Sequence, residues 1–345
     1  EFLRDNGFST DIGAYNIPTA FEAVYGDGTP HIGIIAEYDA LPGIGHACGH
    51  NIIATSALGA GVALKRVVDA LGGTISVIGT PGEEGRGGKI LMQQNGAFAN
   101  LDAAMMIHPG SYNMAGCIAM AVAILEVEFY GKASHAAGAP QHGINALEAM
   151  IISYNAINSL RQHVNDGSRV HGIITDGGQA PNVVPSHSAG TFYIRSTNDG
   201  YLETLKEKVI ACFQSGALAT GSRLEYDWTA PQYRTMNNND VMSNLFAKNL
   251  ESLGRVVDTY ENKNFGSTDM GNVSYLVPSI HPIIAVSPPD VPIHTEEFEA
   301  YAKSDAAHKA MFDGATAMAW TVVDLLSDSS LLKDASQAFK YRTDP

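Results

Sequence analysis

Residues that can bind a metal ion or move a proton are concentrated in a few short segments of this chain. The densest segment is His46-Ala47-Cys48-Gly49-His50-Asn51. A thiolate and an imidazole two residues apart can both reach one ion, and Gly49 lets the backbone fold tightly between them. Taken alone, the segment fits equally well a buried cysteine beside a histidine that caps a helix.

The second segment is an acidic pair, Pro81-Gly82-Glu83-Glu84-Gly85. Adjacent side chains just past a strand end face different ways, so one carboxylate can bind a metal while the other takes a proton from water. The alternative is a solvated acidic turn. His108 and His294 are isolated histidines next to prolines, and a lone histidine is more often structural than a ligand.

The elements that must position these residues alternate between strands and helices. Short apolar runs predict strands over His31–Ala36, Thr74–Gly79 and Ala103–Ile107. Apolar positions three and four residues apart predict helices over Asn51–Ala70 and Gly88–Gln94. This alternation predicts a mostly parallel, three-layer α/β sheet.

Near residue 117 the pattern changes. The predicted order there is β-α-β-β-α-β, which is typical of a ferredoxin-like α+β sandwich. Its predicted elements are Val122–Tyr130, Asn145–His163, Arg169–Thr175, His187–Arg195, Leu202–Gly216 and Arg223–Thr229.

The α/β pattern returns after Pro231 with a helix over Asp240–Leu253, a strand over Ile283–Val286 and helical stretches to about Leu326. We therefore predict a discontinuous α/β domain over residues 1–117 and 232–345, with an α+β domain inserted at 118–231. The polar tail from Ser327 onward is expected to be loosely held.

The placement of the candidate residues strengthens the metal hypothesis. Cys48 and His50, the glutamate pair and His108 each follow a different predicted parallel strand, and His294 follows the strand Ile283–Val286. Ligands in open α/β sheets gather at the carboxyl ends of the strands. One cysteine, three histidines and two glutamates there favour a metal site, and mixed nitrogen, oxygen and sulfur donors suit zinc, manganese or cobalt.

Composition limits the remaining possibilities. The 345 residues allow two or three domains, and 36 acidic against 21 basic residues give a net charge of −15. This excess argues against nucleic acid or an anionic membrane as a partner. No apolar run approaches the ~20 residues of a membrane span. Three widely spaced cysteines favour a reducing compartment, and we expect a cytoplasmic protein. The first residues have the pattern of the middle of a helix, so we expect that the N-terminus has been shortened.

The sequence resembles the co-catalytic metallopeptidases that include aminoacylase and the glutamate-releasing carboxypeptidase. It resembles most the amidohydrolase branch with hippurate hydrolase, indole-acetyl-amino-acid hydrolase and p-aminobenzoyl-glutamate hydrolase. The matching stretches follow the family's order over most of the chain: Ala36–Pro42, His46–Asn51, Gly82–Gly85, His108-Pro109, Gly131–Ala136, Asn182–Pro185 and His294-Thr295.

Two departures from the pattern are informative. Many relatives have Asp where this chain has Asn51, and a Ser-Glu-Asp-Phe segment where it has Gly266–Asn272. Both resemble the p-aminobenzoyl-glutamate hydrolase and dipeptidase sub-branch.

The resemblance implies two divalent ions per subunit, zinc or manganese with cobalt also possible. Their expected ligands are Cys48, His50, Glu84, His108 and His294. Glu83 matches the general base that activates the water bound to the metals. The inserted domain is expected to act as a lid and to form a homodimer.

In that lid, His135 matches the histidine that stabilises the tetrahedral oxyanion. Asn182 and Arg195 match positions that bind substrate, Arg195 at the substrate carboxylate; their alternatives are a turn residue and a surface charge. Asp39 is expected to orient a ligand, and His46 to do the same or to cap its loop.

The leading hypothesis is therefore a metal-dependent amidohydrolase that cleaves the amide bond of N-acyl amino acids or dipeptide-like substrates with a free carboxylate. A metallo-aminopeptidase is one alternative, and a non-catalytic metal-binding scaffold of the same fold is another. The remaining histidines, including His281, are interpreted as surface or structural, and Cys117 and Cys212 as small buried hydrophobic residues.

Overall fold

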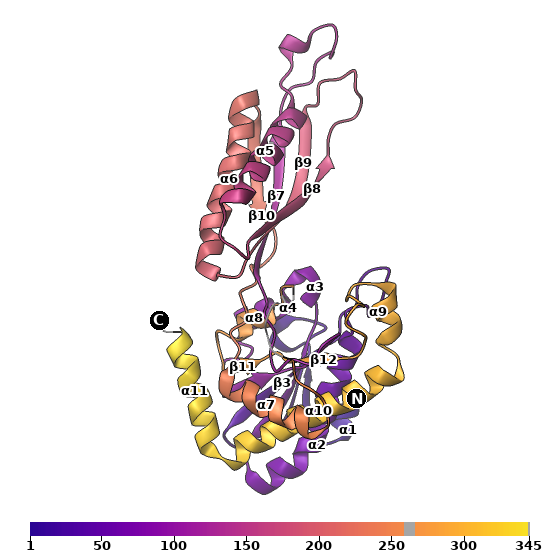
Figure 1. Ribbon diagram of the computed structural model, residues 1–345, viewed down its shortest axis with the longest axis vertical. Coiled ribbons are helices and arrows are strands. Elements are labelled where there is room, and N and C mark those ends of the chain that lie inside the picture. Colours follow the sequence, from indigo (N-terminus) through magenta and orange to yellow (C-terminus); the bar gives the residue numbers. More distant parts are fainter. Residues whose placement is uncertain (259–265, 344–345) are drawn as a thin grey trace. The chain divides into compact units, whose positions relative to one another are not determined.

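The computed structural model describes residues 1–258 and 266–343, and side chains as far as residue 340 (Figure 1). The chain divides into two compact units. Unit 1 consists of residues 1–119 and 236–345, and unit 2 consists of residues 120–235.

Unit 1 is built on a six-stranded sheet with the strand order β1-β2-β4-β3-β5-β11 and a separate pair, β12-β6. Strands β4, β3, β5 and β11 are parallel, whereas β1 and β2 join the edge at β4 in antiparallel fashion. The strands are β1 (Ser9–Ile12), β2 (Phe21–Gly26), β3 (His31–Glu37), β4 (Thr74–Thr80), β5 (Ala103–Met105), β6 (His108–Gly110), β11 (Ser279–Ile280) and β12 (Ile283–Ala285).

Helices cover this sheet on both faces. The helices are α1 (Phe2–Asp5), η1 (Ala14–Asn16), α2 (His50–Leu71), α3 (Glu83–Arg86), α4 (Gly88–Gln94), α7 (Asp240–Ser252), α8 (Met270–Val273), α9 (Glu296–Tyr301), α10 (Asp305–Ser327) and α11 (Ser329–Thr343). Ile34 of β3 packs into the core with α2, α7 and α10, and its neighbour Ile35 packs into the core with α4 and α8. A strand buried on both faces explains the continuous apolar run, and the predicted α/β class is confirmed.

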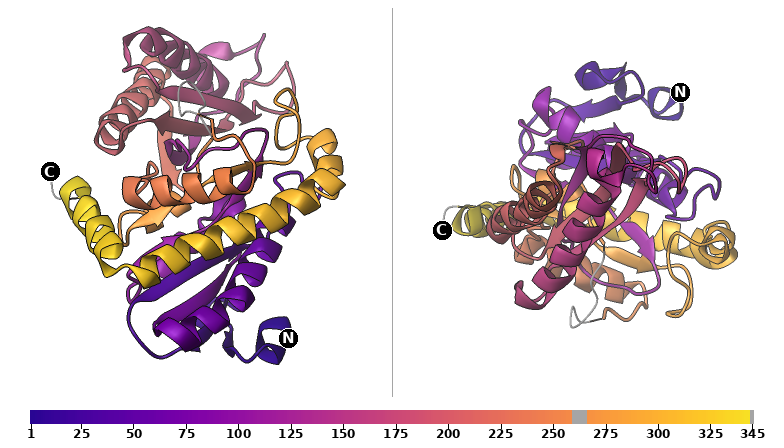
Figure 2. Two further views of the ribbon diagram at one scale, coloured as in Figure 1. Left: turned by 60° about the horizontal axis from the view of Figure 1, so that its bottom comes forward. Right: turned by 90° about the horizontal axis from the view of Figure 1, so that it is seen from above.

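Helix α2 is the central helix of unit 1. It begins after Gly49 and ends at Gly72, whose backbone N–H donates to Val68 O. Figure 2 shows the long helix α10 running alongside it. By length and composition alone α2 could cross a membrane, but it packs against β3, β4 and α10 as a core helix.

Unit 2 has the strand order β10-β7-β9-β8 with every neighbouring pair antiparallel, which is the ferredoxin-like order expected from the sequence. Its elements are β7 (Ala121–Tyr130), η2 (Pro140–His142), α5 (Ala146–Leu160), η3 (Arg161–His163), β8 (Arg169–Asp176), β9 (His187–Ser196), α6 (Asp199–Thr220) and β10 (Arg223–Trp228). Figure 1 shows α5 and α6 on one face of this sheet.

The two faces of the unit 2 sheet differ in chemistry. The face under the helices is apolar, with Phe129 and Phe192 against Phe213 of α6. The opposite face is polar: His187 lies 2.6 Å from the carboxylate of Asp176 and 3.1 Å from that of Glu128.

Three features differ from the sequence-based expectation. The predicted strand Ala103–Ile107 is shorter, and His108 starts β6 in a separate two-stranded sheet. The antiparallel strands β1 and β2 were not predicted. The expectation of a loosely held tail is wrong, because α11 packs against α7 with Ala335 fully buried, and Asn239 Nδ2 donates to Ala335 O at 2.8 Å.

Candidate active site

The loop between β3 and α2 presents the cysteine and histidine of the densest segment. Gly49 has φ +78°, a left-handed conformation that glycine adopts without strain, and it turns the chain between Cys48 and His50. Both side chains are buried. Cys48 Sγ lies 3.5 Å from His108 Nε2, and the rings of His50 and His108 meet edge to face at 5.7 Å.

The acidic turn after β4 presents the glutamate pair. Gly82 and Gly85 both have positive φ, so the turn is tight. Glu83 is buried, whereas Glu84 is partly exposed and its Oε1 lies 3.3 Å from His294 Nε2. The two neighbouring carboxylates therefore have different environments, as is expected of adjacent residues just past a strand end.

His294 reaches this group from the loop after β12. Its backbone has φ +66°, which is uncommon for a residue with a side chain and which occurs preferentially at functional sites. The backbone N–H of His294 donates to Ala47 O at 2.8 Å and ties the two loops together. Thr295 then caps α9 by accepting a hydrogen bond from the backbone N–H of Phe298.

Together these side chains form two sets of possible metal donors that share one cysteine. The first set is Cys48, His50 and His108, and the second is Cys48, Glu84 and His294; within each set the donor atoms lie within 4.8 Å of one another. His50 Nε2 and Glu84 Oε1 are both buried, and each faces another ionisable group of the site: Glu37 Oε1 lies 3.1 Å from the first and His294 Nε2 lies 3.3 Å from the second. The residues therefore fit two divalent cations, and Cys48 could contribute to holding either of them.

The electrostatics of the thiol also fit cation binding. Burial, together with the neighbouring carboxylates of Glu84 and Glu83, raises the pKa of Cys48 well above its usual value. A thiolate there requires a compensating cation, and metal binding would release the thiol proton. Burial and the nearby His50 lower the pKa of His108 to about 4, so its ring is neutral at pH 7 and keeps a lone pair for an ion.

The buried charges of the site shift the pKa values of Glu83 and His50 upward. Burial raises the pKa of Glu83 well above its usual value, and the carboxylates of Glu37 and Asp269 raise it further. Burial alone would lower the pKa of His50, but the carboxylates of Glu37, Asp39 and Glu83 outweigh it and raise that pKa to about 9. In the absence of a cation the protonated His50 therefore balances part of this negative charge.

Asp39 links two of the donor residues. Its Oδ1 lies 3.2 Å from His50 Nδ1, and its Oδ2 accepts a hydrogen bond from the backbone N–H of Glu84 at 3.0 Å. Burial raises the pKa of Asp39, but these two hydrogen bonds outweigh that effect and leave the pKa well below its usual value. His46 makes no such link within the described residues, among which its buried Nδ1 has no hydrogen-bond partner.

Three buried residues near the site were not predicted from the sequence: Glu37, Lys89 and Asp269. Lys89 Nζ donates to Asp269 Oδ1 at 2.7 Å and also to Glu37. The sequence contained only a weak indication of this cluster, namely a single lysine inside the apolar run of α4. His281 is structural rather than a surface residue, with Nδ1 3.2 Å from Cys117 Sγ and its ring 5.5 Å from that of His108.

The three predicted lid residues lie in unit 2. His135 and Asn182 are on adjacent exposed segments, joined by the hydrogen bond from Ala136 N to Asn182 O at 3.0 Å. His135 Nδ1 accepts hydrogen bonds from the backbone N–H groups of Ala137 and Gly138, at 3.2 and 3.0 Å. A neutral His135 ring therefore carries its proton on Nε2, where it can be donated.

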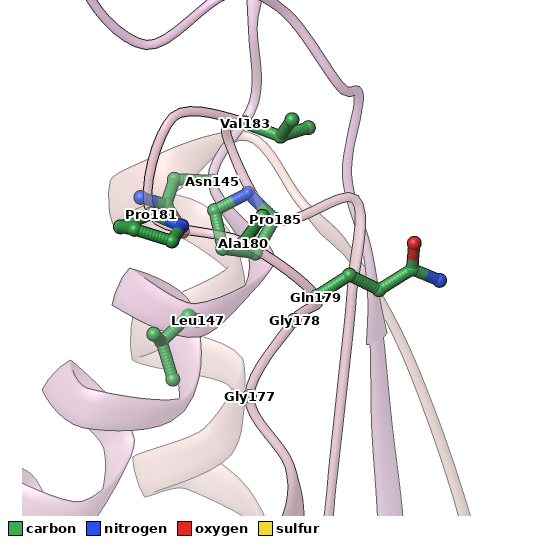
Figure 3. A pocket seen from close by; sticks show the side chains of 9 residues that line it. All are labelled: Asn145, Leu147, Gly177, Gly178, Gln179, Ala180, Pro181, Val183 and Pro185. Carbon is green, nitrogen blue, oxygen red and sulfur yellow. The ribbon is translucent and has the colours of Figure 1, made fainter.

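The segment that carries Asn182 also forms one wall of a pocket against the start of α5 (Figure 3). Its lining is uncharged and consists of Asn145, Leu147, Gly177, Gly178, Gln179, Ala180, Pro181, Val183 and Pro185.

Arg195 lies on β9, on the polar face of the unit 2 sheet. Its Nε donates to His171 Nε2 at 3.3 Å, and its guanidinium lies 5.5 Å from the centre of the Tyr193 ring. Burial lowers the pKa of Arg195. A guanidinium on an open sheet face can bind a carboxylate through two parallel hydrogen bonds.

Donor sets for two cations at the ends of parallel strands, next to a buried glutamate, define the class of protein: a metal-dependent hydrolase with a three-layer α/β domain. Peptidase family M20/M25/M40 matches residues 33–316, and the chain belongs to this family. The suspected resemblance is thereby confirmed.

Known relatives agree with this assignment. The chain is 37% identical to the Xaa-Arg dipeptidase of Mus musculus, over 95% of this chain and 79% of the relative. It is 30% identical to one of the p-aminobenzoyl-glutamate hydrolase proteins of Escherichia coli (strain K12), over 99% of this chain and 87% of the relative.

Among solved structures, the fold matches the Bacillus subtilis YXEP protein, described as a dinuclear metal binding peptidase from the M20 family. The TM-score is 0.68 at 19% identity, over 94% of this chain and 90% of that chain. The chain is therefore an enzyme that hydrolyses peptide or amide bonds with the help of metal ions.

Proposed function

We propose that this enzyme is a dipeptidase-like amidohydrolase with two divalent cations, and that it cleaves the amide bond to an amino acid with a free carboxylate. The observation that carries the proposal is the pair of donor sets that share Cys48, with Glu83 buried beside them. Cys48, His50 and His108 would hold one ion, and Cys48, Glu84 and His294 the other. Zinc, manganese and cobalt all suit this donor set.

The bound ions would polarise the amide carbonyl and lower the pKa of a water molecule. Glu83 then takes the proton from the attacking water and delivers it to the leaving amine. Its burial supports this role, because a raised pKa brings a carboxyl group closer to the operating pH of a general acid and base. Asp39 would orient the His50 ring through Nδ1, and His46 would support the same loop.

Unit 2 is proposed to act as a lid that contributes three residues. His135 donates from Nε2 to the oxyanion of the tetrahedral intermediate, and its two backbone hydrogen bonds at Nδ1 support this role because they fix the proton on Nε2. Arg195 pairs with the substrate carboxylate, and Asn182 hydrogen-bonds the substrate near His135.

The substrate is proposed to be a dipeptide with a basic C-terminal residue. The relative with 37% identity is named for Xaa-Arg dipeptides. The net charge of −15 favours a cationic side chain over the anionic glutamate of p-aminobenzoyl-glutamate, through the overall field of the protein. Hydrolysis of p-aminobenzoyl-glutamate is the second candidate, supported by the E. coli relative.

We also propose a homodimer formed through unit 2 and a cytoplasmic location. Strand β8 is an edge of the unit 2 sheet, and Ile173 and Ile174 on it are 65% and 40% exposed. An exposed apolar edge strand is suited to pairing with a second copy. All three cysteines, each in the described part of the chain, are free thiols, which supports a reducing compartment.

The central experiment compares Glu83→Gln with the wild type after loading with zinc, manganese or cobalt. Loss of the general base is expected to lower kcat by roughly 10²–10⁴-fold while the fold and the metal content are retained. Glu251→Gln, at an exposed position of α7, is the matched control and should behave like the wild type. A fully active Glu83→Gln enzyme would refute the mechanism.

The substrate panel contains Xaa-Arg and Xaa-Lys dipeptides, p-aminobenzoyl-glutamate and N-acyl amino acids. Each dipeptide is also tested with either its amino or its carboxyl end blocked. Loss of activity on blocking the carboxylate supports the proposal, whereas loss only on blocking the amine would indicate an aminopeptidase. No hydrolysis of any member by metal-loaded protein would favour a binding scaffold.

A further inference from the structure

A cluster of three buried charges lies behind the candidate metal ligands and includes none of them. Lys89 of α4, Glu37 at the end of β3 and Asp269 before α8 are each 0% exposed. Asp269 holds the lysine twice: Oδ1 accepts from Lys89 Nζ at 2.7 Å, and Oδ2 accepts from the Lys89 backbone N–H at 2.8 Å. Lys89 Nζ also donates to Glu37 Oε2.

The other oxygen of Glu37 faces the donor residues. Glu37 Oε1 is buried and lies 3.1 Å from His50 Nε2. Donor atoms of Glu37, His50 and Glu83 lie within 4.8 Å of one another. One carboxylate therefore has Lys89 on one side and a candidate ligand and the candidate base on the other.

The charges decide what this carboxylate can do. The Lys89 ammonium occupies one oxygen of Glu37 and opposes a cation bound directly by that carboxylate. A buried lysine without a counter-charge strongly destabilises a fold, so Asp269 and Glu37 are needed to keep Lys89 in place. With all three groups ionised the cluster has a net charge of −1, and the remaining negative charge lies beside His50.

We propose that Lys89, held by Asp269, is a positioning residue that fixes the Glu37 carboxylate, which places negative charge beside His50 Nε2 and so next to the cations that the site would bind. This inference rests on the proposed function, because it requires His50 to bind a metal. Groups that surround the ligands of a metal site typically change its metal affinity by about 10–100-fold when they are removed.

The test measures Co²⁺ binding to protein from which metal has been removed, by calorimetry and by the visible absorption spectrum of the bound ion. Glu37→Gln keeps the shape of the side chain and leaves Lys89 paired with Asp269. We expect its dissociation constant for Co²⁺ to rise by about 10–100-fold and its Co²⁺ spectrum to change. Lys248→Met and Glu251→Gln, both at exposed positions of α7, are the controls and should bind as the wild type does.

Lys89→Met is the second variant. This substitution removes the counter-charge of two buried carboxylates, Glu37 and Asp269, so circular dichroism is used to check that the variant folds. If it folds, its Co²⁺ affinity and spectrum should both differ from those of the wild type, because the lysine no longer holds the Glu37 carboxylate. A role in stability alone would lower the melting temperature of the metal-free protein and leave the affinity and spectrum of folded Glu37→Gln unchanged. An affinity within about threefold of the wild type in folded Glu37→Gln would overturn the inference.

The wild type and Cys48→Ser separate this inference from the proposed function. If the wild type binds no Co²⁺, or if Cys48→Ser binds it equally well, the proposed metal site is wrong and the inference fails with it. If the wild type binds two ions through Cys48 and hydrolyses dipeptides, an unchanged Glu37→Gln refutes only the role of the buried cluster.

Discussion

Gly49 lies between two candidate metal ligands, and replacing it by alanine tests the geometry of the site. Its φ of +78° is a left-handed conformation, which costs a residue with a Cβ roughly 1–2 kcal/mol. The added Cβ would also lie 2.4 Å from Cγ and 3.1 Å from Cβ of Pro109, and 3.4 Å from a ring carbon of Phe298. Overpacking of this kind typically costs about 1–3 kcal/mol, so the total is about 2–5 kcal/mol.

The site should respond as well as the fold, because Pro109 directly follows His108. Relief of the clash must move either β6 or the loop that holds Cys48 and His50. We therefore expect Gly49→Ala to weaken Co²⁺ binding and to lower the melting temperature of the metal-free protein, by about 2–4 °C for each kcal/mol in a unit of this size.

Gly43 provides a matched control in the same loop. Its φ is +82°, and nothing lies within 4 Å of the position of an added Cβ. Gly43→Ala therefore carries the conformational cost without the clash, and the difference between the two variants isolates about 1–3 kcal/mol of packing. If Gly49→Ala melts no lower than Gly43→Ala and binds Co²⁺ equally well, the close approach of Gly49 to Pro109 is refuted.

Four further predictions concern metal removal, pH, packing and assembly. Removal of metal with a chelator should lower the melting temperature, since a ligand at 100 times its dissociation constant adds about 2.7 kcal/mol to the free energy of unfolding. Equal melting temperatures with and without metal would contradict the donor sets. Hydrogen bonds to two carboxylates raise the pKa of His187, so its stabilising contribution is complete below about pH 6.5 and is lost as the pH rises through the folded pKa. In urea titrations at pH 5.5, His187→Gln should therefore be less stable than the wild type, by under about 1 kcal/mol because the site is exposed. At pH 9 the two proteins should be equally stable. The same difference in stability at both pH values would be inconsistent with this pairing. Gly216→Ala would place a Cβ 2.3 Å from α5 and should destabilise unit 2 by about 1–3 kcal/mol, and an unchanged urea midpoint would argue against that helix contact. If the proposed dimer forms, Ile173→Lys should convert it to a monomer in light scattering, whereas Ile12→Lys, at a residue 62% exposed in unit 1, should not. A dimer in both variants would exclude the β8 edge as the interface.

Much of the fold could be predicted because local patterns agreed with the tertiary packing. Strands such as β3 are buried on both faces and read as continuous apolar runs, and the helices of unit 2 begin at capping side chains such as Asn145 and Asn198. The tail was predicted wrongly because helix α11 has a polar sequence around a narrow apolar face. That face becomes visible only when Ala335 is placed against α7.

The candidate donor residues could be named from the sequence because each belongs to a motif of the family and comes after a predicted strand. Their positions in the sequence determined which side chains are candidates: Cys48, His50, Glu84, His108 and His294, with Glu83 beside them. The motifs alone did not determine how these residues are divided between two ions.

The sequence by itself determined the family, the α/β class and the types of donor atom, because these depend on motifs and periodicity along the chain. Only the tertiary structure decided that Cys48 belongs to both donor sets and that Lys89 lies buried between Glu37 and Asp269. Those relations join residues as far apart in the chain as Cys48 and His294, and no local spacing encodes them. The physical reason is burial: a buried charge must have a partner, and which partner it has depends on how the strands and helices pack.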